Sequence, residues 1–92
     1  MAYFAITYLY DPALSETADE IRPKHRAFLG ELRDRGVNVA SGPLDGGASA
    51  LLIFEAGSAD EVAALLDEDP FKKASVVKER TIRPWNPVIS RF

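Results

Sequence analysis

Residues 3–10 read YFAITYLY, an aromatic and β-branched run that ends at Asp11-Pro12. These residue types favour a β-strand, and the Asp-Pro pair is typical of the turn that follows one. Successive side chains point to opposite faces of a strand. One face would carry Phe4, Ile6, Tyr8 and Tyr10, and the other Tyr3, Ala5, Thr7 and Leu9. Because both faces are largely apolar, we expect the sheet containing this strand to be covered on both sides.

Three further strands are predicted along the chain. Residues 37–41 form one, which Gly42-Pro43 would end, and the turn Asp45-Gly46-Gly47 leads into the next at residues 48–55. That strand also has two apolar faces, with Ala50, Leu52 and Phe54 on one side and Leu51 and Ile53 on the other. Residues 76–82 form the last strand, after which Pro84 and Pro87 make the tail extended.

Two helices are predicted between these strands. The first runs to about Arg35 and is closed by Gly36, with Pro23 in its first turn. An alternative start lies in the segment 17–20, which can cap an earlier turn that bends at the proline. The second helix opens with the capping box of residues 58–61 and ends at Asp69-Pro70. The inward positions are Ile21, Phe28, Leu29 and Leu32 in the first helix, and Val62, Leu65 and Leu66 in the second.

The order β-α-β-β-α-β predicts an α+β, ferredoxin-like fold in a single domain spanning residues 1–92. Two helices cover only one face of a four-stranded sheet. The simplest cover for the second apolar face is another copy of the same sheet, which predicts a symmetric homodimer. The alternative is that these residue types occur only because they suit strand geometry.

Composition restricts the class of protein. The chain has 92 residues, no cysteine and a net charge of −3. The absence of cysteine excludes disulfides and thiolate chemistry and suits a cytoplasmic location. The charge argues against a nucleic-acid partner. The first twelve residues lack a basic segment and their apolar run stops at Asp11, so we expect neither a signal peptide nor a membrane span.

His25, the only histidine, lies on the apolar face of the first predicted helix, four residues after Ile21 and three before Phe28. Asp69 ends the inner stripe of the second, three residues after Leu66. If the two helices lie side by side, these residues can meet, and pairing would offset the cost of burying either one. A carboxylate on one imidazole nitrogen leaves the other as an acid or base near neutral pH. A purely structural role for both residues is the alternative.

Other residues are candidates for binding a substrate. Arg22 can hold an anion beside His25, helped by free N–H groups if the helix begins at Pro23, although a solvated or ion-paired arginine is the simpler interpretation. Ser41 and Gly42 can line a pocket where the strand ends, or form a plain turn. Phe71 and Trp85 can be aromatic pocket walls or core residues.

Metal and cofactor sites are not predicted. Asp67, Glu68 and Asp69 are successive carboxylates, which point in different directions if the helix includes them. One histidine and no cysteine offer few metal ligands. The sequence also lacks a phosphate-binding loop, a nucleophile elbow and a dinucleotide fingerprint.

The sequence resembles the YciI-like (YCII-related) family. The resemblance covers nearly the whole chain and rests on the aromatic first strand, RPKH at residues 22–25, SGP at 41–43, GSADEVAALLDEDPF at 57–71 and RPW at 83–85. It implies a dimeric α+β barrel, similar to that of muconolactone isomerases, and a pocket in which His25 pairs with Asp69. One characterised activity of the family is removal of chloride from a chlorinated hydroxyhydroquinone. The short glycine-rich loop ending at Ala48, where many relatives are longer, leaves the substrate open.

The leading hypothesis is a cofactor-independent lyase or isomerase acting on a small acidic cyclic or aromatic compound. His25 would move a proton, Asp69 would orient it, and Arg22 with Ser41 would hold the oxygens of the substrate. The alternatives are a module that binds or senses a small ligand without converting it, and a structural role in a larger assembly.

Overall fold

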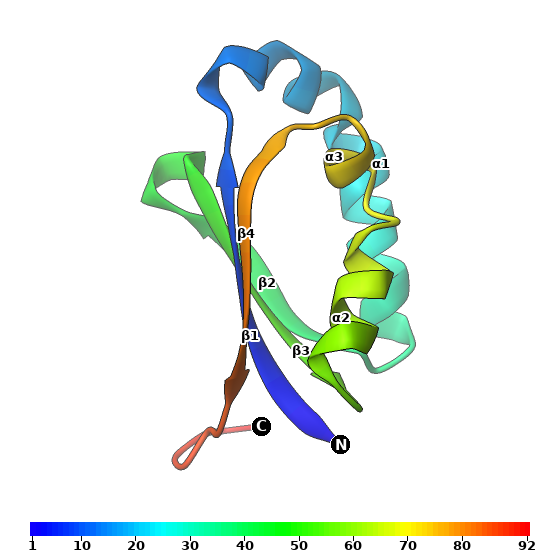
Figure 1. Cartoon of the computed structure of the whole chain (residues 1–92), viewed down its shortest axis with the longest axis vertical. Helices are drawn as coiled ribbons and strands as arrows, with labels where there is room; N and C mark the ends of the chain where they lie inside the picture. The colour runs from blue at the N-terminus through cyan, green and yellow to red at the C-terminus, as the bar shows by residue number, and fades with distance from the viewer.

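Four strands pair into one antiparallel sheet in the order β2-β3-β1-β4. The computed structural model describes residues 1–92, and its helices all lie on one side of this sheet (Figure 1). The strands are β1 (Ala2–Tyr10), β2 (Asn38–Leu44), β3 (Ser49–Ala56) and β4 (Val77–Trp85). The helices are α1 (Ser15–Asp34), α2 (Ala59–Leu66) and the short α3 (Pro70–Lys73), with 3₁₀ turns η1 (Pro12–Leu14) and η2 (Asp45–Gly47). The predicted β-α-β-β-α-β order is confirmed, with α3 as an addition.

The core lies between the sheet and the helices. Phe4, Ile6 and Tyr8 of β1 are buried on this side, as the strand alternation predicts. They pack with Leu52 and Phe54 of the central strand β3. The helices contribute Leu32 from α1 and Val62 and Leu66 from α2. The helical spacing in the sequence had placed these three residues inward.

The prolines of the two edge strands do not end them, which corrects two predicted boundaries. β2 continues through Gly42 and Pro43, which pair with Leu51 and Ala50. β4 likewise continues to Trp85, and Pro84 pairs with Phe4. Both strands lie at an edge of the sheet, where a missing N–H directed away from the neighbouring strand disrupts no ladder bond. Sequence alone does not reveal which strands are edges.

Helix α1 begins at Ser15, so the prediction of a helix whose first turn contains Pro23 was wrong. Pro23 lies inside the helix, where it removes one backbone donor. Packing offsets this loss, because Ala18 in the first half of α1 is buried against Phe71 and Val76. The other end is as predicted: Gly36 follows the helix with a φ of +79°, a conformation that glycine adopts without strain.

Helix α2 is held at its start by the predicted capping box. Ser58 Oγ accepts a hydrogen bond of 3.1 Å from the backbone N–H of Glu61, and the Glu61 carboxylate accepts one of 3.0 Å from the N–H of Gly57. The helix ends at Leu66, before Asp69. The sequence had placed Asp69 at the end of the apolar stripe of this helix, and that placement was wrong. Asp69 is the N-cap of α3.

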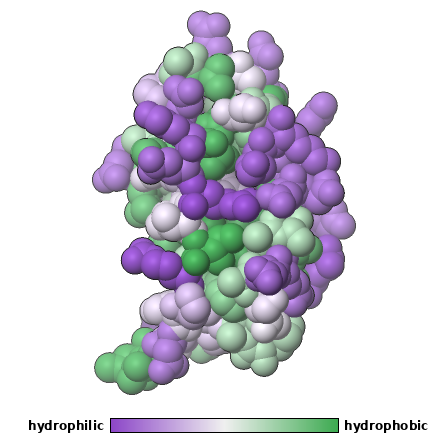
Figure 2. Space-filling view, in the orientation of Figure 1, coloured by the Kyte–Doolittle hydropathy of each residue, from purple (hydrophilic) through white to green (hydrophobic).

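The second face of the sheet carries no helix (Figure 1). It presents the side chains opposite to the core positions, including Leu9, Leu51 and Trp85, all exposed. The hydroxyls of Thr7 and Thr81 bond across β1 and β4 on this face. The chain ends in a tail whose Val88 and Ile89 are exposed, and Figure 2 shows apolar surface at the lower tip where this tail lies. We call this side of the sheet the open face.

Candidate active site

The two residues predicted to form a pair lie on different elements and meet beside the sheet. His25 comes from the middle of α1, and Asp69 precedes α3. His25 Nδ1 lies 2.8 Å from Asp69 Oδ1 and 3.0 Å from Oδ2. Within one chain the structure therefore brings the imidazole and the carboxylate into hydrogen-bond contact.

Asp69 is fully buried, with 0% of its surface exposed, and three groups form hydrogen bonds with its carboxylate oxygens. Besides His25, the backbone N–H of Phe71 donates to Oδ1 over 2.9 Å, and the Tyr8 hydroxyl donates to Oδ2 over 3.0 Å. A buried carboxylate without such partners would be strongly unfavourable. These three donors therefore hold the carboxylate in one orientation, with Nδ1 of His25 as one of its partners.

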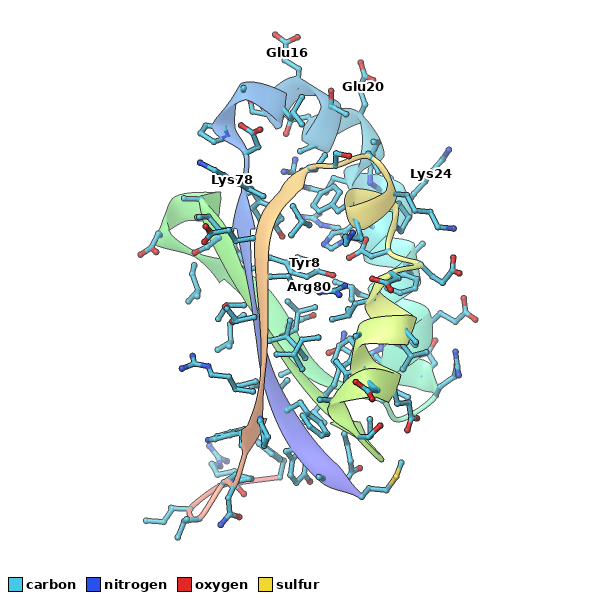
Figure 3. The ribbon with its side chains drawn as sticks, viewed as in Figure 1. Tyr8, Glu16, Glu20, Lys24, Lys78 and Arg80 are labelled. Carbon is cyan, nitrogen blue, oxygen red and sulfur yellow. The ribbon has the colours of Figure 1, made fainter.

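Sequence reasoning did not identify Tyr8 as part of this cluster, although it grouped Tyr8 with Phe4 and Ile6 on one face of β1. Figure 3 shows Tyr8 directed from the sheet towards the helix layer, with Arg80 of β4 beside it. Burial, together with the nearby Asp69 carboxylate, raises the pKa of Tyr8 well above its usual range. The phenol thus stays protonated and remains a donor to Asp69.

Phe71 forms the aromatic wall that the sequence suggested. Its ring stacks on the imidazole of His25, with centroids 3.8 Å apart and planes inclined by only 7°. The ring of Tyr10 meets Phe71 edge-on at 5.5 Å, and the guanidinium of Arg22 lies 5.9 Å above the Phe71 ring. The imidazole is therefore fixed by its stacking partner as well as by Asp69.

Next to this cluster is a cavity of about 230 Å³, which we call the His25 pocket. Five of the predicted site residues line it: Arg22, His25, Ser41, Gly42 and Phe71. Sequence reasoning had not included the remaining lining residues, which are Tyr10, Arg26, Leu29, Pro43, Gly47, Ala50 and Leu52. Helical spacing was the available signal for Arg26 and Leu29, which lie four and seven residues after Arg22 on one face of α1.

The electrostatics of the His25 pocket favour an anion. Arg22 and Arg26 line it, and no carboxylate does. Arg22 also pairs with the exposed Asp19 three residues earlier, as the simpler interpretation of this arginine had it. Because α1 begins before Pro23, the free N–H groups expected at that point are absent.

Tyr10, which also lines the His25 pocket, stays protonated near neutral pH. Burial is the main cause that raises the pKa of Tyr10 to about 12, and the Asp69 charge adds to it.

Trp85 does not reach this pocket. It pairs with Tyr3 across β1 and β4, on the face opposite to Phe4 and Ile6, and packs edge-on against the Tyr3 ring at 6.5 Å. The Phe92 ring lies 6.1 Å from it. The strand alternation therefore places Trp85 on the open face, which corrects its assignment to the pocket within one chain.

The three successive carboxylates turn to separate partners. Asp67 pairs with Arg80 over 2.9 Å, Glu68 pairs with Lys73 over 2.6 Å, and Asp69 binds His25. No group of three or more histidine or carboxylate side chains is arranged as a set of metal ligands.

The sheet order, with all helices on one side, defines a ferredoxin-like α+β fold of the dimeric α+β barrel class. The chain belongs to the YCII-related domain family, whose model matches residues 1–86. Membership of this family confirms the resemblance found in the sequence.

The solved structures that are similar to the chain include two with different activities. One is 5-chloro-2-hydroxyhydroquinone dehydrochlorinase (TftG) from Burkholderia phenoliruptrix in complex with 2,5-dihydroxybenzoquinone, with 26% identity, a TM-score of 0.79, and coverage of 91% of this chain and 93% of that one. The other, an antibiotic biosynthesis monooxygenase, has 12% identity, a TM-score of 0.61, and coverage of 97% and 100%. The second likeness shows the fold alone. No curated protein matches the chain.

None of the helices has the length and apolar character needed to span a membrane. The cytoplasmic location stays a prediction.

Proposed function

We propose that the protein is a cofactor-independent lyase or isomerase that uses His25 for acid–base chemistry on a small acidic cyclic or aromatic compound. The observation that carries the proposal is the contact of His25 Nδ1 with the buried Asp69 carboxylate at 2.8 Å, beside a cavity that His25 lines. The likeness to a solved dehydrochlorinase at 26% identity supports the same class of chemistry.

The proposed roles follow from this geometry. Asp69 accepts a hydrogen bond from the Nδ1–H of His25 and so selects the tautomer whose Nε2 is a free base. Nε2 then removes a proton from a substrate held in the His25 pocket. In an elimination, the electron pair of that bond forms a double bond and the leaving group departs with its own pair, so no oxidant or reductant is needed. Arg22 holds an anionic oxygen of the substrate, with Ser41 as a hydrogen-bonding partner and Phe71 as a flat wall.

The test is the His25→Ala variant, assayed with chlorinated hydroquinones, hydroxylated aromatics and small lactones. Loss of the proton-transferring group should lower kcat about 10²–10⁴-fold. Lys24→Ala is the matched control, because Lys24 neighbours His25 on α1 but points away from the sheet (Figure 3). The pH dependence of kcat/KM should show an ionisation that the His25→Ala protein lacks. An unchanged rate in His25→Ala would rule out this mechanism.

A second function is a module that binds a small ligand without converting it. It is favoured by the other contacts of Asp69, which caps α3 and holds Tyr8 and so has a structural use that needs no catalysis. Calorimetry distinguishes the two functions. A compound that binds in the His25 pocket and is not converted by any form of the protein would favour the binding module.

The partner that we infer is a second copy of the chain, packed against the open face. The support for this homodimer is the exposed apolar side chains of that face, of which Leu51 is central and 36% exposed. A stable interface of this kind buries about 1,200 Å² or more in total.

A further inference from the structure

A second hollow borders the His25 pocket and has no part in the function proposed above. It measures about 380 Å³ and lies between α1 and the edge strand β2. We call it the α1–β2 groove. Its walls are Arg26, Leu29, Gly30 and Arg33 from α1 and residues 38–41 from β2. Arg26, Leu29 and Ser41 also line the His25 pocket, so the two hollows adjoin at these side chains.

The α1–β2 groove is positively charged although the chain as a whole carries −3. Two of its lining residues are arginines and none is acidic. Arg26 forms no ion pair in the structure, and Arg33 pairs only with its neighbour Asp34, both side chains being about 70% exposed. A guanidinium offers several donors in a geometry that suits a carboxylate. The groove therefore favours an anionic group.

Gly30 keeps the groove open at some cost to the helix. Glycine is unfavourable in a helix interior, and Gly30 lies well within α1. A Cβ added at this position would meet nothing closer than the Arg33 guanidinium at 3.9 Å, an ordinary contact distance. Packing within the chain therefore does not require a glycine here. The missing side chain leaves space beside Arg26 and Arg33.

The wall of the groove contains a buried polar side chain that lacks one partner. Asn38 is only 7% exposed. Its Nδ2 donates to the Leu29 carbonyl over 3.1 Å and to Ser41 Oγ over 3.2 Å, while its Oδ1 is buried with no hydrogen-bond partner. A buried carbonyl oxygen in this state needs a donor. A water molecule that enters the groove can supply one, whereas a carboxylate, which only accepts hydrogen bonds, cannot.

We propose that the α1–β2 groove binds the carboxylate of a flexible side chain on a substrate whose ring lies against His25. This inference rests on the proposed function, since it takes the His25 pocket as the place of the ring. His25 and Arg33 are eight residues apart, which is about 12 Å along a helix, and Arg26 lies between them. A ring with an acidic side chain of three or four carbon atoms spans that length, with its carboxylate near Arg26 and Arg33.

The test compares 4-(4-hydroxyphenyl)butanoate with its methyl ester, which has the same ring and chain but no charge. Binding is measured by titration in two-dimensional ¹H–¹⁵N NMR spectra, in which the backbone amide signals of Gly30 and Ser41 report on the groove. The acid should bind up to about fivefold more tightly than the ester, the upper end of what one exposed charge contact contributes. In Arg26→Gln the preference for the acid should decrease, because only Arg33 then remains in the groove. Arg35→Gln, which removes an exposed charge outside the groove, should keep the full preference. Gly30→Glu should make the ester the tighter ligand.

These outcomes separate the groove from the reaction. His25→Ala should leave the preference for the acid intact, so a failed turnover test and a failed groove test are distinguishable. Equal affinities for acid and ester in the unmodified protein would overturn the proposal, as would a preference that Arg26→Gln does not change. The absence of acid binding up to about 10 mM would overturn it as well.

Discussion

Asp69 performs two tasks at once, and both depend on the same two oxygen atoms. Its Oδ1 accepts from the Phe71 N–H and caps α3, while the carboxylate as a whole holds the His25 imidazole and the Tyr8 hydroxyl. The carboxylate is acceptor-only, and all three partners are donors. Its contribution to stability and its proposed contribution to catalysis therefore cannot be removed separately.

This arrangement predicts that Asp69→Asn both destabilises the fold and lowers turnover. The amide keeps the volume, but its NH₂ group would face donors at one of the two oxygen positions. Leaving a buried donor without an acceptor costs about 1–3 kcal/mol, so the urea midpoint should fall accordingly. The control is Glu68→Gln, which breaks only the exposed pair with Lys73 and should change stability by less than about 0.5 kcal/mol. Equal midpoints for the two variants would show that Asp69 is not the buried acceptor described above.

Tyr8 and Tyr10 predict how stability depends on alkaline pH. Burial raises the pKa of both phenols, that of Tyr10 to about 12 and that of Tyr8 further. In the unfolded chain both titrate near 10. Because the folded pKa is the higher one, the unfolded state loses protons first as the pH rises. The contribution to stability is thus complete below pH 10 and is lost progressively as the pH rises from 10 through the folded pKa values.

The measurement is the unfolding free energy in urea between pH 8 and about pH 11, alongside the phenolate absorbance of the folded protein. We expect stability to fall above pH 10, and two of the phenols to resist ionisation until above that pH. Tyr8→Phe should make the fall in unfolding free energy above pH 10 less steep, because the variant lacks the phenol whose pKa is raised by folding. A fall in stability of equal slope in Tyr8→Phe would contradict the role given to this phenol.

At the scale of elements, α2 depends on its cap. It is short, with eight residues, and short helices need tertiary contacts and caps to form. Ser58→Ala removes the side-chain acceptor of the Glu61 N–H and should destabilise the protein by about 1 kcal/mol. Ser58→Asp restores an acceptor and should recover most of that loss in urea unfolding. The idea fails if both variants unfold at the same urea concentration.

The helices and strands also show which parts of the fold can be predicted from the sequence and which cannot. Alternation in β1 and β3 and the helical spacing of Leu32 and Leu66 depend on local geometry, and the predicted core follows from them. Prolines were misread because their effect depends on position in the sheet or on packing: Pro43 and Pro84 are tolerated on edge strands, and Pro23 inside α1.

The candidate site was predictable only in part for the same reason. The sequence proposed that His25 and Asp69 meet, and they do, although Asp69 reaches His25 as the cap of α3 and not from the stripe of α2. Phe71 was proposed as an aromatic wall or a core residue, and its ring stacks on His25. Tyr8 joins the cluster because α3, a helix too short for a periodic signal, turns the Asp69 carboxylate towards β1. Trp85 was misplaced because its face depends on how β4 pairs with β1. The pairing shifts by one residue between Leu9, which pairs with Glu79, and Tyr10, which pairs with Val77. The sequence of either strand alone does not reveal this shift.

At the scale of the whole molecule, the open face is the largest feature that the single chain leaves unexplained. On this face the side chain of Ile53 is buried, but those of Leu9, Leu44 and Leu51 are exposed. At one end the rings of Tyr3, Trp85 and Phe92 form a cluster, and the tail beyond β4 exposes Ile89 almost completely, at 94%. An antiparallel sheet whose outer face meets only water ordinarily alternates apolar with polar residues.

The homodimer inferred from this face predicts that a charge at its centre separates the two chains. Leu51→Lys places an ammonium group in the middle of the proposed interface, where pairing two symmetric copies would bring two like charges close together. Light scattering at micromolar concentration should give a dimer for the unmodified protein and a monomer for Leu51→Lys. Ala64→Lys, an exposed position on α2, makes the same change on the helix side and should remain dimeric. A monomer in the unmodified protein, or a Leu51→Lys protein that stays dimeric with full stability, would mean that the open face is not the interface.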